Sequence, residues 1–188
     1  MDLEQIRQLI LEMGAYRAGV VAVEDIDFQP DFRKLCESNA CGMYGRSWMC
    51  PPLVGEVDQL IENLKRWRWA VVYQTVDALE DSYDFEGMMA AGEKMNQLTA
   101  RIRRGLAEKG ISPVLLLGAG GCRVCRRCAK LDGQPCRNPE QAIASLEAYG
   151  INVSVLAPQA GMKYINGVDT VTYFGAVFLG EGDAPCPR

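Results

Sequence analysis

Histidine is absent from this sequence of 188 residues, and its absence removes several classes of site at once. A Ser-His-Asp or Cys-His catalytic arrangement, a zinc finger of two cysteines and two histidines, and a histidine-ligated haem all need an imidazole. Any metal ion or cluster in this chain therefore depends on thiolate, carboxylate or backbone donors.

Long apolar runs and a strong net charge are missing as well. No stretch approaches about 18 consecutive apolar residues, so the sequence predicts no transmembrane helix. The formal net charge is only −4, so we expect no general attraction to nucleic acid or anionic lipid. The first residues, Met-Asp-Leu-Glu-Gln-Ile-Arg, lack the apolar core of a secretory signal, and we expect a cytoplasmic protein.

Eight cysteines are present, and clustered cysteines in such a setting indicate metal or redox chemistry more often than disulfides. The more specific group is Cys122, Cys125, Cys128 and Cys136, whose first three members recur at every third residue. A single zinc ion usually takes ligands from two separated C-x2-C pairs, whereas this run wraps the chain around a wider body. A [4Fe–4S] cluster is such a body, and bacterial ferredoxins begin with the same spacings, although their fourth cysteine follows sooner.

The residues around this group suit an anionic cluster. Gly118, Gly120 and Gly121 precede it, and they allow the backbone to approach sulfur closely, although a tight turn alone would also use them. Cations in the same stretch would stabilise the cluster and dock an acidic redox partner; the alternative is a solvated basic loop. These cations are Arg123, Arg126, Arg127, Lys130 and Arg137.

A second group, Cys36, Cys41 and Cys50, is less diagnostic. It would hold a second cluster, or it would consist of small buried side chains. Because two such clusters bind one thiolate per iron, the count closes if Cys186 is the eighth ligand or if ligands are exchanged between the groups. If Cys186 is not a ligand, one cluster keeps an open iron that binds substrate.

Hydrophobic periodicity predicts helices over 2–13, 56–67, 85–108 and 138–149, and strands over 18–23, 69–76, 113–118 and 170–179. Residues 28–55 form a structured loop in this interpretation. We therefore expect a single domain over 1–188 of mixed α/β class, with one sheet of about four or five strands flanked by helices. The cysteine-rich metal-binding loops would lie at strand ends.

Four segments resemble the conserved boxes of a prokaryotic family of cysteine-rich "predicted metal-binding proteins". They are Cys-Gly-Met-Tyr-Gly-Arg-Ser-Trp-Met-Cys-Pro-Pro at 41–52, Cys-Arg-Val-Cys-Arg-Arg-Cys-Ala at 122–129, Pro-Cys-Arg-Asn-Pro at 135–139 and Ser-Leu-Glu-Ala-Tyr-Gly at 145–150. The resemblance implies metal binding by the seven cysteines other than Cys186 and an anaerobe-leaning source. It implies no reaction and gives Cys186 no role.

Three hypotheses follow from these observations. The first is an iron–sulfur protein with one or two [4Fe–4S] clusters that passes single electrons to a partner redox protein. The second is an enzyme whose three-thiolate cluster acts through its open iron on a small oxygen- or sulfur-containing substrate, in a pocket lined by Tyr44, Arg46 and Trp48. The third is a structural zinc-binding protein. None of them involves nucleic acid or a membrane.

Overall fold

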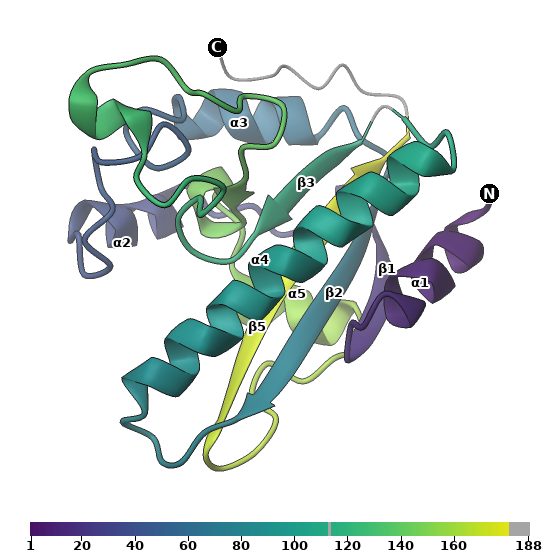
Figure 1. Cartoon of the computed structure of the whole chain (residues 1–188). Helices are drawn as coiled ribbons and strands as arrows, with labels where there is room; N and C mark the ends of the chain where they lie inside the picture. The colour runs from purple at the N-terminus through teal and green to yellow at the C-terminus, as the bar shows by residue number, and fades with distance from the viewer. Residues whose placement is uncertain (113, 181–188) are drawn as a thin grey trace.

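A computed structural model describes residues 1–112 and 114–180, and it has a mixed α/β architecture around one open sheet (Figure 1). The sheet has five strands in the order β1-β2-β5-β3-β4, which confirms the predicted class and strand number. The bounds are β1 Arg17–Ala22, β2 Trp69–Ala78, β3 Leu115–Gly118, β4 Ala144–Ser145 and β5 Thr170–Leu179. All neighbouring pairs are antiparallel except β3 and β4, which run parallel.

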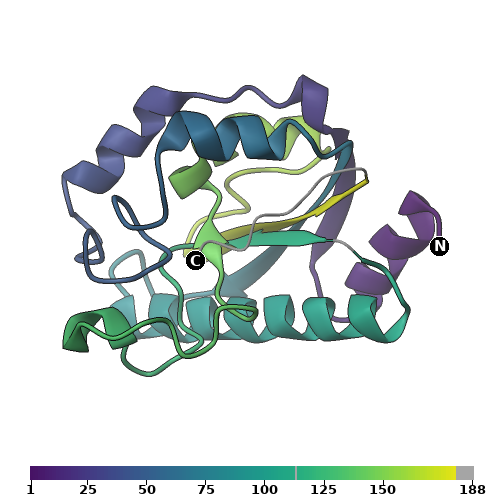
Figure 2. The ribbon, with the colours of Figure 1, turned by 90° about the horizontal axis from the view of Figure 1, so that it is seen from above.

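Helices cover both faces of the sheet, so the molecule has three layers (Figure 2). On one face lie α1 (Leu3–Glu12) and α4 (Phe85–Glu108); on the other lie α3 (Val57–Leu64) and α5 (Val153–Gln159). Successive residues of β2 alternate between the two cores: Val71 and Tyr73 pack with α1 and α4, whereas Ala70 and Val72 pack with α3 and α5. The near-continuous apolar run of β2 is explained by this burial on both faces.

The long helix α4 has the predicted bounds, and its buried apolar face occupies the part from Ala91 onwards, whereas Phe85 and Met89 of the first turns are exposed. Met95, Leu98, Ile102 and Leu106 recur at helical spacing and are at most 1% exposed. Asp84 caps the first turn by accepting a hydrogen bond from the Gly87 N–H at 2.8 Å.

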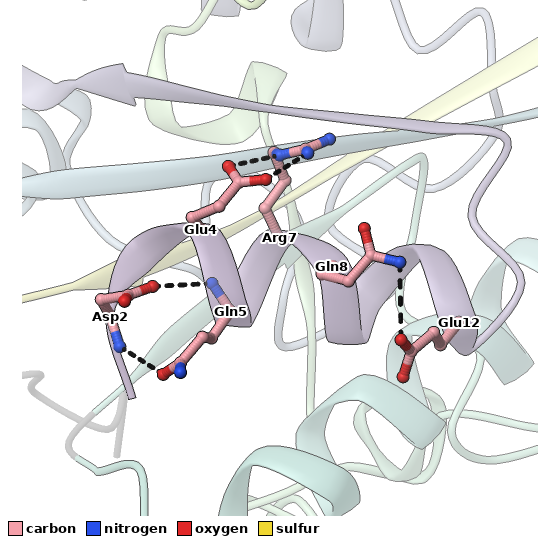
Figure 3. Close-up of polar contacts among 6 residues, drawn as sticks. All are labelled: Asp2, Glu4, Gln5, Arg7, Gln8 and Glu12. Carbon is pink, nitrogen blue, oxygen red and sulfur yellow. Dashed lines mark hydrogen bonds and ion pairs between the residues drawn. The ribbon is translucent and has the colours of Figure 1, made fainter.

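The first helix begins at a reciprocal cap (Figure 3). The Asp2 carboxylate accepts from the Gln5 N–H at 2.8 Å, and the Gln5 side chain accepts from the Asp2 N–H at 3.0 Å. Glu4 and Arg7 form an ion pair one turn apart on the same helix. The buried residues Ile6 and Ile10 hold this helix on the sheet.

The prediction of a helix over 138–149 is wrong. Asn138 closes only one turn, after which β4 pairs with β3 and a short 3-10 helix, η4, covers Glu147–Tyr149. The Arg103 guanidinium donates to the carbonyl oxygens of Glu140 and Ala142, at 2.8 and 3.3 Å. Those contacts and the strand pairing take up backbone groups that a helix would use, so tertiary contacts override the local pattern.

The helix α5 was not predicted, since Val153, Val155 and Pro158 are poor helix formers. Its one local signal is Asn152, whose side chain accepts from the Ser154 N–H at 3.1 Å.

The remaining predictions concern shorter segments. Residues 28–55 contain two short helices, η2 (Pro30–Arg33) and α2 (Lys34–Glu37), followed by an irregular loop. Two further 3-10 turns are η1 (Val23–Asp25) and η3 (Ala129–Asp132). Residue 113, part of a predicted strand, and the segment containing Cys186 lie outside the described residues. Within the part that is described, no helix is both long and apolar enough to span a bilayer.

Candidate metal site

Both cysteine groups lie on loops that meet beside the carboxyl end of β3. The second group follows this strand, and the loop of the first group lies next to it in both views (Figures 1 and 2). The indole N–H of Trp48 joins the two loops by donating to the Gln134 carbonyl at 3.0 Å. The seven described cysteines are all free thiols.

The four cysteines of the second group line one small cavity of about 20 Å³. Cys122, Cys125, Cys128 and Cys136 are all half-buried around it, although Cys136 is remote from the triplet in sequence. The Asn138 side-chain amide donates to the Cys125 sulfur at 3.1 Å. The cavity has room for about one water-sized body, so the four cysteine residues line a single small space.

The first group is more unequal in its exposure. Cys36 on α2 is half-buried, Cys41 is exposed and Cys50 is buried. Burial raises the pKa of the Cys50 thiol to about 11, and the nearby Cys41 and Cys36 add to this effect. Burial also raises the pKa of Cys36, and the charges of Glu147 and Cys41 act in the same direction. The three thiols of the first group therefore affect one another electrostatically.

Ser47 connects the two groups. It is 1% exposed, and hydrogen bonding by its hydroxyl lowers the pKa of both the Cys50 and the Cys128 thiol. Partial burial raises the pKa of Cys128, but hydrogen bonds from the Lys130 and Trp48 backbone and from Ser47 outweigh burial and lower it overall. The Cys128 thiol therefore loses its proton to a metal more easily than an ordinary cysteine does.

A close backbone contact also joins the groups. The Cys50 thiol is hydrogen-bonded to the Cys122 backbone. A Cβ added at Gly121 would lie 3.4 Å from the Cys50 sulfur and 3.2 Å from the Met43 side chain. Glycine at this position therefore lets the backbone pass close to the Met43 side chain and the Cys50 sulfur of the first group. The close approach that the sequence predicts for Gly121 is to a cluster on the second group, and it stays a prediction.

The donor chemistry fits a soft metal centre. Among the described residues no three Cys, Asp or Glu side chains are close enough to hold a metal ion as they stand. The thiols line a shared space nevertheless, and thiolates without imidazole are the donor set of zinc–thiolate and iron–sulfur sites. The cysteines therefore fit such a group once the sulfurs turn inwards.

Several basic side chains of the second loop hold the loop together. Arg127 pairs with Asp132 at 2.9 Å, and Arg137 donates to the Arg127 carbonyl. The Lys130 ammonium lies 5.0 Å from the centre of the Trp48 ring.

The sequence did not predict that three further residues act on the cysteine thiols. These residues are Ser47, Asn138 and Glu147. Asn138 lies two positions after Cys136, which is a local signal, and Ser47 lies within the first cysteine loop. Glu147 had no local signal, since only the fold packs η4 against η2, the turn that precedes α2. Of the pocket residues expected for the enzyme hypothesis, Trp48 lines the cysteine cavity, whereas Tyr44 and Arg46 are not among its lining residues.

Comparison with known proteins gives one match. Residues 19–179 match a family described as "predicted metal-binding protein" (DUF2284), a span that includes all seven described cysteines. No curated protein and no solved structure matches this chain.

Proposed function

This chain belongs to the family of predicted metal-binding proteins (DUF2284), and from that premise we propose that it is an iron–sulfur protein with a [4Fe–4S] cluster on Cys122, Cys125, Cys128 and Cys136. The observation that carries the proposal is that these four cysteines line one cavity and that none of the first group's cysteines lines it, although Ser47, Trp48 and Met49 of the first loop do. Such a cluster supplies reversible single-electron chemistry when bound.

The neighbouring groups have defined roles in this proposal. Asn138 donates to the Cys125 sulfur, and Ser47 reaches Cys128, so both stabilise negative charge on sulfur. Hydrogen bonds of this kind raise the reduction potential of a cluster. The partly buried sulfurs are shielded from water by Trp48 and Met49, which line the same cavity.

The first group would hold a second cluster beside the first. Cys36, Cys41 and Cys50 supply three thiolates, and Cys186 remains the proposed eighth ligand. Because Ser47 and Gly121 join the two groups, electrons would pass between adjacent centres. The exposed Arg123 and Arg126 would then meet an acidic redox partner.

Anaerobic purification tests the metal, by quantifying iron, acid-labile sulfide and zinc on the same sample. We expect a brown protein containing iron and sulfide, and Cys125→Ser should lose the cluster of the second group. Met88→Leu, near the start of α4 and not among the residues lining the cysteine cavity, is the control and should keep it. Zinc as the sole tightly bound metal would refute the proposal.

A structural zinc site is the second candidate, since a space of about 20 Å³ suits a single ion without further opening. The same metal analysis separates the two. An enzyme with an open iron is distinguished by Cys186→Ala: unchanged cluster content favours the open iron, and loss of one cluster favours the electron carrier.

A further inference from the structure

A second, much larger cavity lies beside the loop that follows β3 and contains Gly120 and Gly121. It has a volume of about 530 Å³, within the range of small-molecule sites, and separates α4 from the loop that follows β3. Binding residues are found disproportionately on loops positioned by a rigid scaffold, and the loop after β3 is such a loop. Cys122 lines this cleft and also the cysteine cavity, so the two spaces share a wall.

The side of the cleft formed by α4 carries basic and small side chains. Arg103 and Arg104 line it together with two small residues, Ala100 and Ala107. The Arg103 guanidinium is held by the carbonyls of Glu140 and Ala142 described above, so its charge is fixed at the cleft. Arg104 is exposed. Two consecutive arginines, one of them held in a fixed position, are well suited to binding an anion.

The opposite side of the cleft adds a third guanidinium group and the backbone of two glycines. Gly120, Gly121 and Arg123 line it. Gly120 has φ +66°, and a Cβ there would meet nothing within 4 Å, so this part of the loop is uncovered. Loops of this kind leave backbone N–H groups accessible to anions.

The charge balance of the lining decides the ligand class. Three arginines line the cleft against one acid, Glu93, although the whole chain carries a net charge of −4. The other polar lining residues are neutral amides: Asn96, Gln97 and Gln141. We propose that this cleft binds a small molecule carrying a carboxylate or phosphate group, held by Arg103, Arg104 and Arg123 beside Cys122. The inference goes beyond metal binding and does not depend on which metal the thiols hold.

Calorimetric titration tests the cleft directly. The protein as purified is titrated with inorganic phosphate and, separately, with malonate, at constant ionic strength in chloride. We expect saturable binding of at least one probe, and the tighter probe identifies the anionic group. Arg104→Gln combined with Arg123→Gln should weaken binding by at least about tenfold, since each removes a charged hydrogen-bond donor. Ala100→Trp fills the cleft without changing charge and should abolish binding.

Arg66→Gln is the matched control, because Arg66 is exposed and does not line the cleft. Absence of saturable binding to both probes, or an equal loss in Arg66→Gln, would overturn the inference. Metal content is measured on the same samples. Full metal content without anion binding refutes the cleft alone, whereas anion binding by a protein without iron refutes only the cluster.

Discussion

Ser47→Ala tests whether the two cysteine groups form one site. The hydroxyl is almost fully buried, and it accepts a hydrogen bond from the Met49 N–H at 3.3 Å. Its hydrogen bonding also lowers the pKa of both the Cys50 and the Cys128 thiol. Alanine removes these bonds and changes the packing little. A hydrogen bond to a charged group contributes about 1.5–3 kcal/mol.

The expected loss of metal-binding free energy is smaller than the contribution of two full hydrogen bonds, because the sulfurs regain some contacts by relaxation. We expect metal binding to weaken by about 10- to 100-fold, as is typical when a residue supporting a ligand is lost. Ser47 lowers the pKa of both thiols, so its loss should also move metal uptake to higher pH.

The assay is anaerobic reconstitution followed by competition with a chelator, with retained metal per chain measured at several pH values. Ser38→Ala is the matched control: its hydroxyl lies in the same loop but donates to the Leu35 carbonyl at 2.7 Å. The reasoning fails if Ser47→Ala holds its metal as tightly as the unmodified protein, or if Ser38→Ala weakens binding equally.

Three further predictions concern stability and are measured by urea and thermal unfolding of the metal-free protein. Burial raises the pKa of the Cys50 thiol in the folded protein to about 11, against an ordinary value of 9.0. Between these pH values the folded protein keeps a proton that the unfolded protein loses. The free energy of unfolding should therefore fall by up to about 3 kcal/mol between pH 9 and pH 11. A profile that Cys50→Ser leaves unchanged would contradict this. Gly19→Ala should cost more than about 2 kcal/mol, because its Cβ would lie 2.1 Å from the Ala160 carbonyl oxygen. Gly92→Ala, whose Cβ makes ordinary contacts with Tyr173, should stabilise α4 by about 0.5–1 kcal/mol; a loss of stability there would show that the helix packs more tightly than described.

Long periodic segments were predicted accurately. The helix α4 and the strand β5 have the predicted bounds, because each carries a periodic apolar pattern in its own residues, and the later part of each element is buried. Segment 138–149 failed for the opposite reason. Its backbone groups pair with β3 and with Arg103, and neither partner is visible in the local sequence.

The amino-acid sequence by itself determined the chemistry of the candidate site: thiols without imidazole restrict the donors, and the three-residue repeat brings Cys122, Cys125 and Cys128 together locally. Only the tertiary structure decided which other groups join them. Ser47 reaches Cys128 across 81 positions because two loops meet beside one strand end. Residue types fix what a side chain is able to bind, but contacts between distant segments depend on how the sheet and helices pack, and periodicity does not encode that.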